Sequence, residues 1–315
     1  MIKKQYKTKE EKQLNHQRKI KNLKKSQTSY MMMAPYLLIF FTFTIVPVLM
    51  SFALSFTNYD MLQSPKFIGL DNYVNLFLYD DVFLIALKNT LILAVITGPL
   101  SYIMAFLFAW LINELPHKIR WLMTLIFYAP SISGNAYLIW QLLFSSDRYG
   151  YINSFLINLG VIHEPIYWLS TPSYALGILI LVQLWLSLGV SFLSFRAGLQ
   201  TVDRTLYEAA AIDGIKNRWQ ELWYITLPQM KSQLLFGAVM QITNSLGIGM
   251  VSVSLFGMPS TEYAAHTLVT HILDFGSTNS TRLEMGYASA IAVILFLLMM
   301  ASNLIIQKLI RRVGS

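Results

Sequence analysis

Residues 174–195 read YALGILILVQLWLSLGVSFLSF and contain no charged side chain. Roughly 20 apolar residues of helix are enough to cross the hydrocarbon core of a bilayer. Backbone N–H and C=O groups find no water there, so a spanning segment has to satisfy them internally as a helix. This stretch therefore predicts a transmembrane helix.

Five further runs have the same character, and Lys88 is the only charged residue among them: 31–56, 85–112, 121–144, 232–258 and 285–307. The first run is too long for the apolar part of a cleaved signal peptide. The whole chain is 13% charged, whereas soluble domains are about one-quarter charged. Six such runs disfavour a large soluble helical bundle. The predicted fold class is all-α, a polytopic membrane protein with six transmembrane helices.

Basic residues near spans stay on the cytoplasmic side of a membrane. With the N-terminus inside, residues 1–30 place ten basic residues inside, the loop around Lys118 two, segment 196–231 five and the C-terminus three. That is twenty inside against four outside, so both termini are predicted to be cytoplasmic. The positive charge is then explained by the topology and by contact with anionic lipid headgroups, and it does not indicate nucleic-acid binding. Two domains are expected: a basic tail, 1–29, and a transmembrane domain, 30–315.

The longest predicted inner loop, 197–231, begins with a short helix. Thr205 and Glu208 have the spacing of a capping box, which predicts a helix start at Thr205. Ala209 and Ala210 favour helix and give it little bulk. Gly214 suits the left-handed position that ends a helix. A second helix is expected to end at Pro228. A thin helix at a membrane surface suits a groove on a partner protein.

The same loop resembles a known family. Its signature reads Glu208-Ala209-Ala210, then Asp213-Gly214, and later Ile225-Thr226-Leu227-Pro228. This pattern is similar to that of the membrane subunits of binding-protein-dependent ABC importers. Weaker matches to the carbohydrate class of that family, the maltose and glycerol-phosphate transporter type, occur in the order expected along the chain: 67–73, Asn89-Thr90, 150–153 and 285–290.

The resemblance implies a type I importer permease that moves a sugar or oligosaccharide across the cytoplasmic membrane. It implies four kinds of partner: a second permease, often a different chain; two ATPases; an extracytoplasmic solute-binding protein; and membrane lipid. ATP-Mg would be used by the ATPases, and no cofactor is expected on this chain. It also implies which residues couple to the ATPase: Glu208, Ala209, Ala210, Asp213, Gly214, Leu227 and Pro228.

Uncharged polar and aromatic residues within the spans are candidates for a substrate path, since they suit sugar hydroxyls and ring faces. They are Asn135, Tyr137, Gln183, Trp185, Gln241, Asn244 and Ser245. The alternative for each is a hydrogen bond between helices, because Ser, Thr, Asn and Gln commonly pair in membranes. The sequence leaves both alternatives open.

Other functions fit less well. An ion-coupled secondary carrier often has carboxylates at membrane depth, and the six runs contain none. An intramembrane enzyme needs a catalytic constellation that the sequence does not show. His266 and His271 are expected in a solvated outer loop, and no metal site is predicted. Within the importer family, a permease for another solute, such as glycerol phosphate, phosphate or an amino acid, is the main alternative.

Overall fold

The computed structural model describes residues 27–277 and 283–312 and divides the chain into two units, Met1–Ala53 and Leu54–Ser315. The predicted basic tail lies almost wholly outside the described residues. In the first unit, α2 (Gln27–Phe40) continues through a π-helical turn, Phe41–Ile45, into α3 (Val46–Leu54). Pro47 lies two residues after the end of this turn. Its missing N–H removes one regular helical bond, which is a common origin of local rearrangement.

The second unit is built from helices, whose bounds are α4 (Asp71–Leu78), α5 (Asp81–Asn113), α6 (His117–Ile132), α7 (Tyr137–Leu143), α8 (Tyr151–Asn158), α9 (Pro172–Leu186), α10 (Gly189–Thr201), α11 (Arg204–Ile212), α12 (Arg218–Glu221), α13 (Leu227–Gln229), α14 (Lys231–Leu246), α15 (Met250–Phe256), α16 (Leu268–Gly276) and α17 (Met285–Arg312). A π-helical segment, η2 (Leu222–Thr226), joins α12 to α13, and a 3₁₀ turn, η3 (Thr261–Tyr263), precedes α16.

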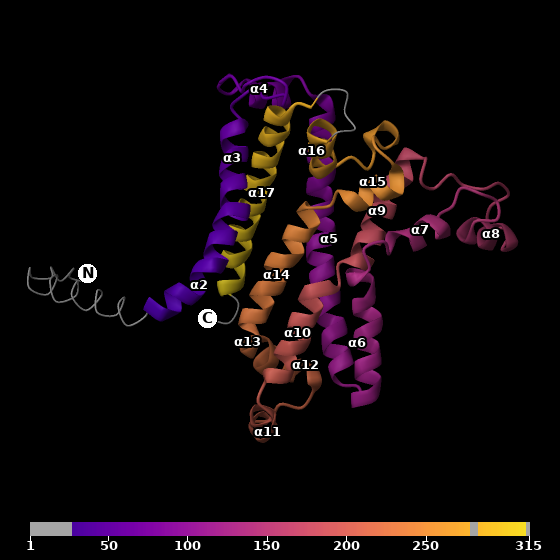
Figure 1. Ribbon diagram of the computed structural model, residues 1–315. Helices are drawn as coiled ribbons and strands as arrows, with labels where there is room; N and C mark the ends of the chain where they lie inside the picture. Colours follow the sequence, from indigo (N-terminus) through magenta and orange to yellow (C-terminus); the bar gives the residue numbers. More distant parts are fainter. Residues whose placement is uncertain (1–26, 278–282, 313–315) are drawn as a thin grey trace, which may run out of the picture. The chain divides into compact units, whose positions relative to one another are not determined.

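Helix α5 is the central column of this unit (Figure 1), with α14 and α17 on one side and α6 and α9 on the other. It contributes to three clusters of buried apolar side chains. Near its C-terminus Ala105 and Ala109 pack with Phe192 and Phe195 of α10. The other two clusters join α5 to α16 and α17, and to α9 and α15. The α11 end and the α4–α16 end of the unit lie far apart.

In the described ranges, four helical stretches are long and apolar enough to cross a membrane, and two bent helix pairs bring the possible number to six. The predicted spans over 121–144 and 232–258 are each interrupted. The first run bends by 87° between α6 and α7, and the second by 42° between α14 and α15. Ser133, Gly134 and Asn135 occupy the first break, and Gly247 and Gly249 flank the second; these residue types favour helix ends over helix interiors.

Among the described residues, three buried asparagines hold loops in place. Asn72 donates to the carbonyls of Ser55 and Thr57. Asn89 of α5 donates to three carbonyls in the segment before α16, the shortest bond being 2.9 Å to His266 O. Asn153 of α8 makes five hydrogen bonds to the loop on either side of it. Each satisfies backbone groups that would otherwise be buried without a partner.

Candidate functional site

The short helix of the 197–231 loop is α11, and it begins one residue earlier than the capping box predicts. Asp203 is the N-cap, and its carboxylate accepts a 3.0 Å hydrogen bond from the Thr205 amide. That bond holds the pKa of Asp203 below its usual range. The predicted Thr205–Glu208 capping box is therefore wrong, because a carboxylate two residues upstream of Thr205 already caps the helix. Glu208 is left without a capping role.

The end of α11 follows the sequence prediction. Gly214 has φ +95°, in the left-handed region. The amides of Gly214 and Ile215 bond back to the carbonyls of Ala211 and Ala210, which is the Schellman arrangement. A Cβ placed on Gly214 would meet no atom within 4 Å. A side chain there is strained by the backbone conformation but meets no clash within this chain.

Most of α11 is exposed. Glu208, Ala209, Asp213 and Gly214 are exposed, and Ala210 is buried. Ile212 is 87% exposed, and Trp219, Trp223 and Tyr224 of the next helical segment are exposed as well. Within the described residues, no hydrogen bond or ion pair engages the Glu208 carboxylate. Large exposed apolar side chains that gather on one surface are typical of a protein-binding site.

The second helix of the loop runs through α12, η2 and α13, so it ends at Gln229, one residue beyond the predicted Pro228. Leu227 is half-buried and Pro228 is exposed. The hydroxyls of Tyr207 in α11 and Thr226 lie 2.9 Å apart and hold the two helices together. Arg218 pairs with Glu221 at 2.9 Å and with Glu114, just after α5, at 3.1 Å.

A pocket of about 500 Å³ opens beside α11. Its walls come from the C-terminal ends of α5 and α10, from α11 and from α12. They carry both signs of charge, with Arg120, Arg204 and Arg218 facing Glu114, Glu208 and Glu221. Glu208 therefore borders a concave, charged surface that continues the exposed face of α11.

Three of the described chain segments are interrupted within the helix bundle. The α6–α7 and α14–α15 breaks are two of them, and the third is the α9–α10 junction at Ser187. The Gln241 side-chain amide donates to Ser187 O at 2.9 Å, and the hydroxyl oxygens of Ser187 and Ser101 lie 2.6 Å apart. A Cβ on Gly189 would lie 2.9 Å from the Cβ of Ser131. These contacts bring α6, just before its break, and the middle of α14 to the α9–α10 junction, beside α5.

The substrate-path candidates divide into two groups at these breaks. Gln183, Gln241 and Ser245 are buried, and the bond from Gln241 to Ser187 O joins two helices. Asn135 and Asn244 are exposed. The Tyr137 hydroxyl donates to Asn135 at 3.1 Å, whereas no hydrogen bond engages the Asn244 amide within the described ranges. Asn244 is thus a candidate whose side-chain amide is exposed and makes no hydrogen bond to a described residue.

Aromatic rings line the region next to the α6–α7 break. Trp185 packs edge-to-face on Trp140, with ring centroids 5.6 Å apart, and Trp140 stacks on Phe144 at 5.9 Å. Tyr137 packs against the same cluster. Among the described residues, the Trp140 indole N–H is buried without a partner. Aromatic faces with an unused donor are suited to amphipathic ligands.

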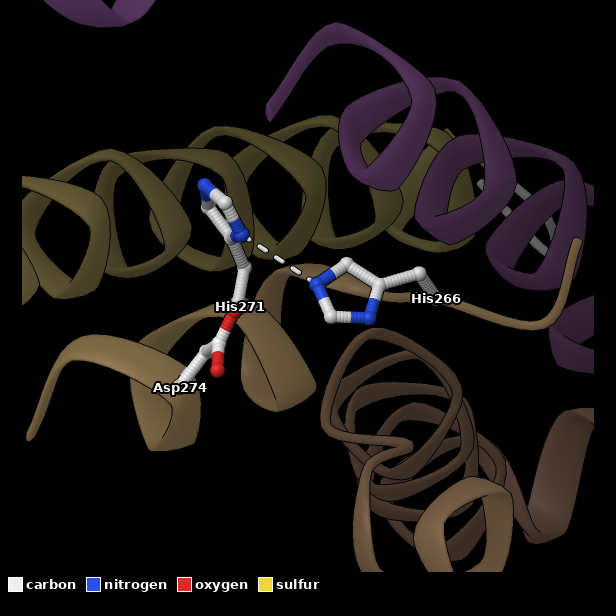
Figure 2. Close-up of side chains that lie close together, drawn as sticks. All are labelled: His266, His271 and Asp274. Carbon is white, nitrogen blue, oxygen red and sulfur yellow. Dashed lines mark hydrogen bonds between the residues drawn. The ribbon is translucent and has the colours of Figure 1, made fainter. Parts of the chain in front are cut away.

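The histidine prediction is wrong. His266 and His271 are 1% and 2% exposed, and His271 lies in α16 rather than in a solvated loop (Figure 2). His271 Nε2 lies 3.0 Å from Asp80 Oδ2, and the Tyr287 hydroxyl donates to the same oxygen at 2.8 Å. These groups are 191 and 207 residues from Asp80, so no local spacing in the sequence indicates the cluster.

Burial alone would raise the pKa of the Asp80 carboxyl. Hydrogen bonds from His271, from the Phe83 amide and from Tyr287 outweigh burial and lower that pKa to about 2. Burial lowers the pKa of His266 to about 4. At neutral pH Asp80 is therefore a carboxylate and His266 a neutral imidazole.

Comparison with known proteins identifies the family. Residues 14–315 match the family described as binding-protein-dependent transport system inner membrane component. The chain is 33% identical over 288 residues to the probable ABC transporter permease protein YesP of Bacillus subtilis strain 168, covering 90% of this chain and 91% of that one. It is 34% identical over 221 residues to the lactose transport system permease protein LacF of Rhizobium radiobacter, covering 69% and 71%.

A solved structure has the same architecture. It is a bacterial alginate ABC transporter in complex with an alginate pentasaccharide-bound periplasmic protein. The TM-score is 0.76 at 26% identity, over 94% of this chain and 98% of the matched chain. Together with the family match, this similarity extends over the breaks and the α11 loop alike. The chain belongs to the family of inner-membrane permease components of binding-protein-dependent ABC importers.

Proposed function

We propose that this permease imports a sugar or oligosaccharide. As an importer permease of the inner membrane, the chain is a transport subunit and not an enzyme. The observation that carries the sugar assignment is its similarity, along nearly its whole length, to a chain of a transporter solved with an alginate pentasaccharide-bound protein. The relative LacF, which by its name serves lactose, supports the same class of solute.

The proposed coupling element is α11 with the turn that follows it. Glu208, Ala209, Ala210, Asp213 and Gly214 would seat in a groove of an ATPase, and Leu227 and Pro228 would set the position of the second helix. Support comes from the exposed apolar face, from the free Glu208 carboxylate and from the charged pocket beside it. ATP-Mg acts on the ATPase and not on this chain.

The proposed assembly contains this chain, a second permease, two ATPases and an extracytoplasmic solute-binding protein. The alginate transporter, which was solved with a periplasmic protein, supports the last of these. A heterodimeric permease pair would place the breaks of two chains face to face, so that each chain supplies half of the path.

The proposed substrate path passes the α6–α7 and α14–α15 breaks. Interrupted helices are tolerated at membrane depth where they line a cavity, and transporters place substrate sites at them. Asn244 and Asn135 present polar groups there, and Trp185 with Tyr137 presents ring faces. Gln241 has a packing role in this proposal, because its amide already bonds to Ser187 O.

Uptake by a strain lacking this gene tests the sugar assignment. The deletion strain should lose uptake of one labelled sugar or oligosaccharide, and a plasmid copy should restore it. Uptake of amino acids and phosphate should stay at the parental level. Loss of glycerol phosphate or amino acid uptake in place of sugar uptake would favour the alternative solute class.

The same assay tests the substrate path through Asn244. Asn244→Ala should lower uptake roughly two- to tenfold, because a lost hydrogen bond to substrate costs about 0.5–1.5 kcal/mol. The protein level in membranes should not change, since the exposed amide makes no bond within the described ranges. Thr243→Val is the control, because the Thr243 hydroxyl already bonds to Val239 O at 2.8 Å. Equal uptake by both variants would remove Asn244 from the path.

Cysteine labelling tests the orientation, and the native chain has no cysteine to interfere. Asn158→Cys, at the end of α8, should react with a membrane-impermeant maleimide added to intact cells. Lys216→Cys, after α11, should react only once the membrane is opened. Both positions are exposed, so accessibility does not depend on burial. The reverse labelling pattern would place α11 outside and exclude it as a coupling helix.

A further inference from the structure

Two buried histidine rings face each other in front of α16. Nε2 of His266 and Nδ1 of His271 lie 3.2 Å apart (Figure 2). Nitrogens at this separation either share a proton or bind one ion together. Two nitrogens bound to a tetrahedral Zn²⁺ at about 2.0–2.1 Å lie roughly 3.3 Å apart. The separation of the two nitrogens therefore matches that of a pair of zinc ligands.

Asp80 decides which nitrogen of His271 is free. A carboxylate only accepts hydrogen bonds, so the 3.0 Å contact with Asp80 Oδ2 puts the proton of His271 on Nε2. Nδ1 then carries a lone pair directed at His266. Metal-binding histidines commonly donate their second N–H to a carboxylate in this way, which fixes the ring and strengthens it as a ligand. Asp80 is itself held by the Phe83 amide and the Tyr287 hydroxyl.

His266 can supply the second nitrogen without loss of a hydrogen bond to the rest of the fold. Its ring is buried and packs edge-to-face on the His271 ring, with ring centroids 5.3 Å apart. The proton on Nε2, which now faces His271, can move to Nδ1 and leave Nε2 as a ligand. The His266 main chain stays in place because Asn89 donates to its carbonyl at 2.9 Å.

Asp274 supplies the third ligand. It follows His271 by three residues on α16, so both side chains lie on the same face of the helix. Its carboxylate, His266 and His271 offer ligand atoms that all lie within 4.8 Å of one another. Asp274 is half-buried, and no hydrogen bond or ion pair engages it in the part of the chain that the structure describes. A small movement of this free carboxylate completes the ligand set.

We propose that this permease binds one Zn²⁺ through His266 Nε2, His271 Nδ1 and the Asp274 carboxylate, with water as the fourth ligand. Two imidazoles and one carboxylate are a ligand set that suits zinc. The ion would fasten α16 to the segment before it and, through Asp80 and Tyr287, to α5 and α17. It would stiffen the α4–α16 end of the unit, opposite the coupling helix.

Zinc content of the purified full chain tests the site. The chain carries a tag without histidines, is stripped with a chelator and is then dialysed against buffered Zn²⁺. Elemental analysis should find one zinc per chain. Co²⁺ in place of Zn²⁺ should give the intense visible absorption of a tetrahedral site. The chain has no cysteine, so thiolates cannot contribute to either signal.

Matched variants assign the ligands. Asp274→Asn should weaken Zn²⁺ binding at least about tenfold and remove the Co²⁺ absorption, while it breaks none of the hydrogen bonds described above. His266→Gln should abolish binding. Exposed His163→Gln, which lies far from α16 in sequence, should bind zinc like the parent. Absence of stoichiometric zinc in the parent chain would overturn the proposal, as would binding that survives both Asp274→Asn and His266→Gln.

Discussion

Replacing Glu208 by glutamine should abolish coupling between this permease and its ATPase while the chain stays folded. The complex is isolated from host membranes through a tag on this chain. The variant should either lose the ATPase during purification or retain it without stimulation of ATP hydrolysis by the loaded solute-binding protein. Fold is preserved because Asp203, and not Glu208, caps α11.

The expected loss of coupling can be estimated from the hydrogen bonds that the Glu208 carboxylate would make on the ATPase. Hydrogen bonds to a charged group contribute about 1.5–3 kcal/mol, which corresponds to roughly 10- to 100-fold in an equilibrium constant. Glu208 has no such bond to any described residue, so we expect its charge to be satisfied on the ATPase. Glu164→Gln, the same change at an exposed position outside the α11 loop, is the control and should leave hydrolysis unchanged.

Gly214→Asp should also abolish coupling, in this case because the added side chain changes the shape of the turn after α11. A side chain in the left-handed region costs roughly 1 kcal/mol of backbone strain. Gly160→Asp isolates that strain, because Gly160 also has a positive φ, +71°, and open space around it. If Gly214→Asp uncouples the complex and Gly160→Asp does not, backbone strain is not the cause. The added side chain at Gly214 then interferes with binding of the ATPase. Normal coupling in both Glu208→Gln and Gly214→Asp would show that α11 is not the coupling helix.

Replacing Asn153 by alanine should release the segment from 145 to 170. The fully buried Asn153 amide donates to the carbonyls of Ser145, Asp147 and Ile166, and its oxygen accepts from the Ile166 amide and the Trp168 indole. Each buried group left without a partner costs about 1–3 kcal/mol. We expect local unfolding to become easier by roughly 3 kcal/mol or more, which is on the order of a 100-fold gain in amide hydrogen exchange.

Hydrogen exchange by mass spectrometry measures this effect peptide by peptide. Asn158→Ala is the matched control, since Asn158 lies on the same helix but is exposed. Exchange over 145–170 should stay at the parental level in the control, and exchange over α5 should stay so in both variants. An unchanged exchange rate in Asn153→Ala would show that the loop is held by contacts other than these five bonds.

The sequence predicted the helical membrane fold, the family and the position of the short helix in the 197–231 loop. These features depend on properties that are local in the chain: runs of apolar residues, and the Ala-rich stretch before Gly214. The weaker family matches also have a physical basis in the fold. Asn89 and Asn153 lie in matched segments, and both bind backbone carbonyls of loops.

The remaining features depend on contacts between distant segments. Hydropathy cannot separate a continuous span from one that bends by 87° at Ser133–Asn135, because both are equally apolar. The start of α11 differs from the prediction because Asp203 and Thr205 are both good N-cap residues, and the structure uses Asp203. The burial of His266 and His271 could not be predicted, since it depends on Asp80 and Tyr287 from other helices.

ATP-dependent uptake into proteoliposomes tests the central claim most directly. The complex isolated through this chain is reconstituted with ATP enclosed on the α11 side and with labelled sugar and loaded binding protein on the other side. Sugar should accumulate in liposomes that hold the parent chain, and accumulation should fall at least about tenfold with Glu208→Gln. Equal accumulation by the two proteins, or accumulation that needs no ATP, would contradict the account.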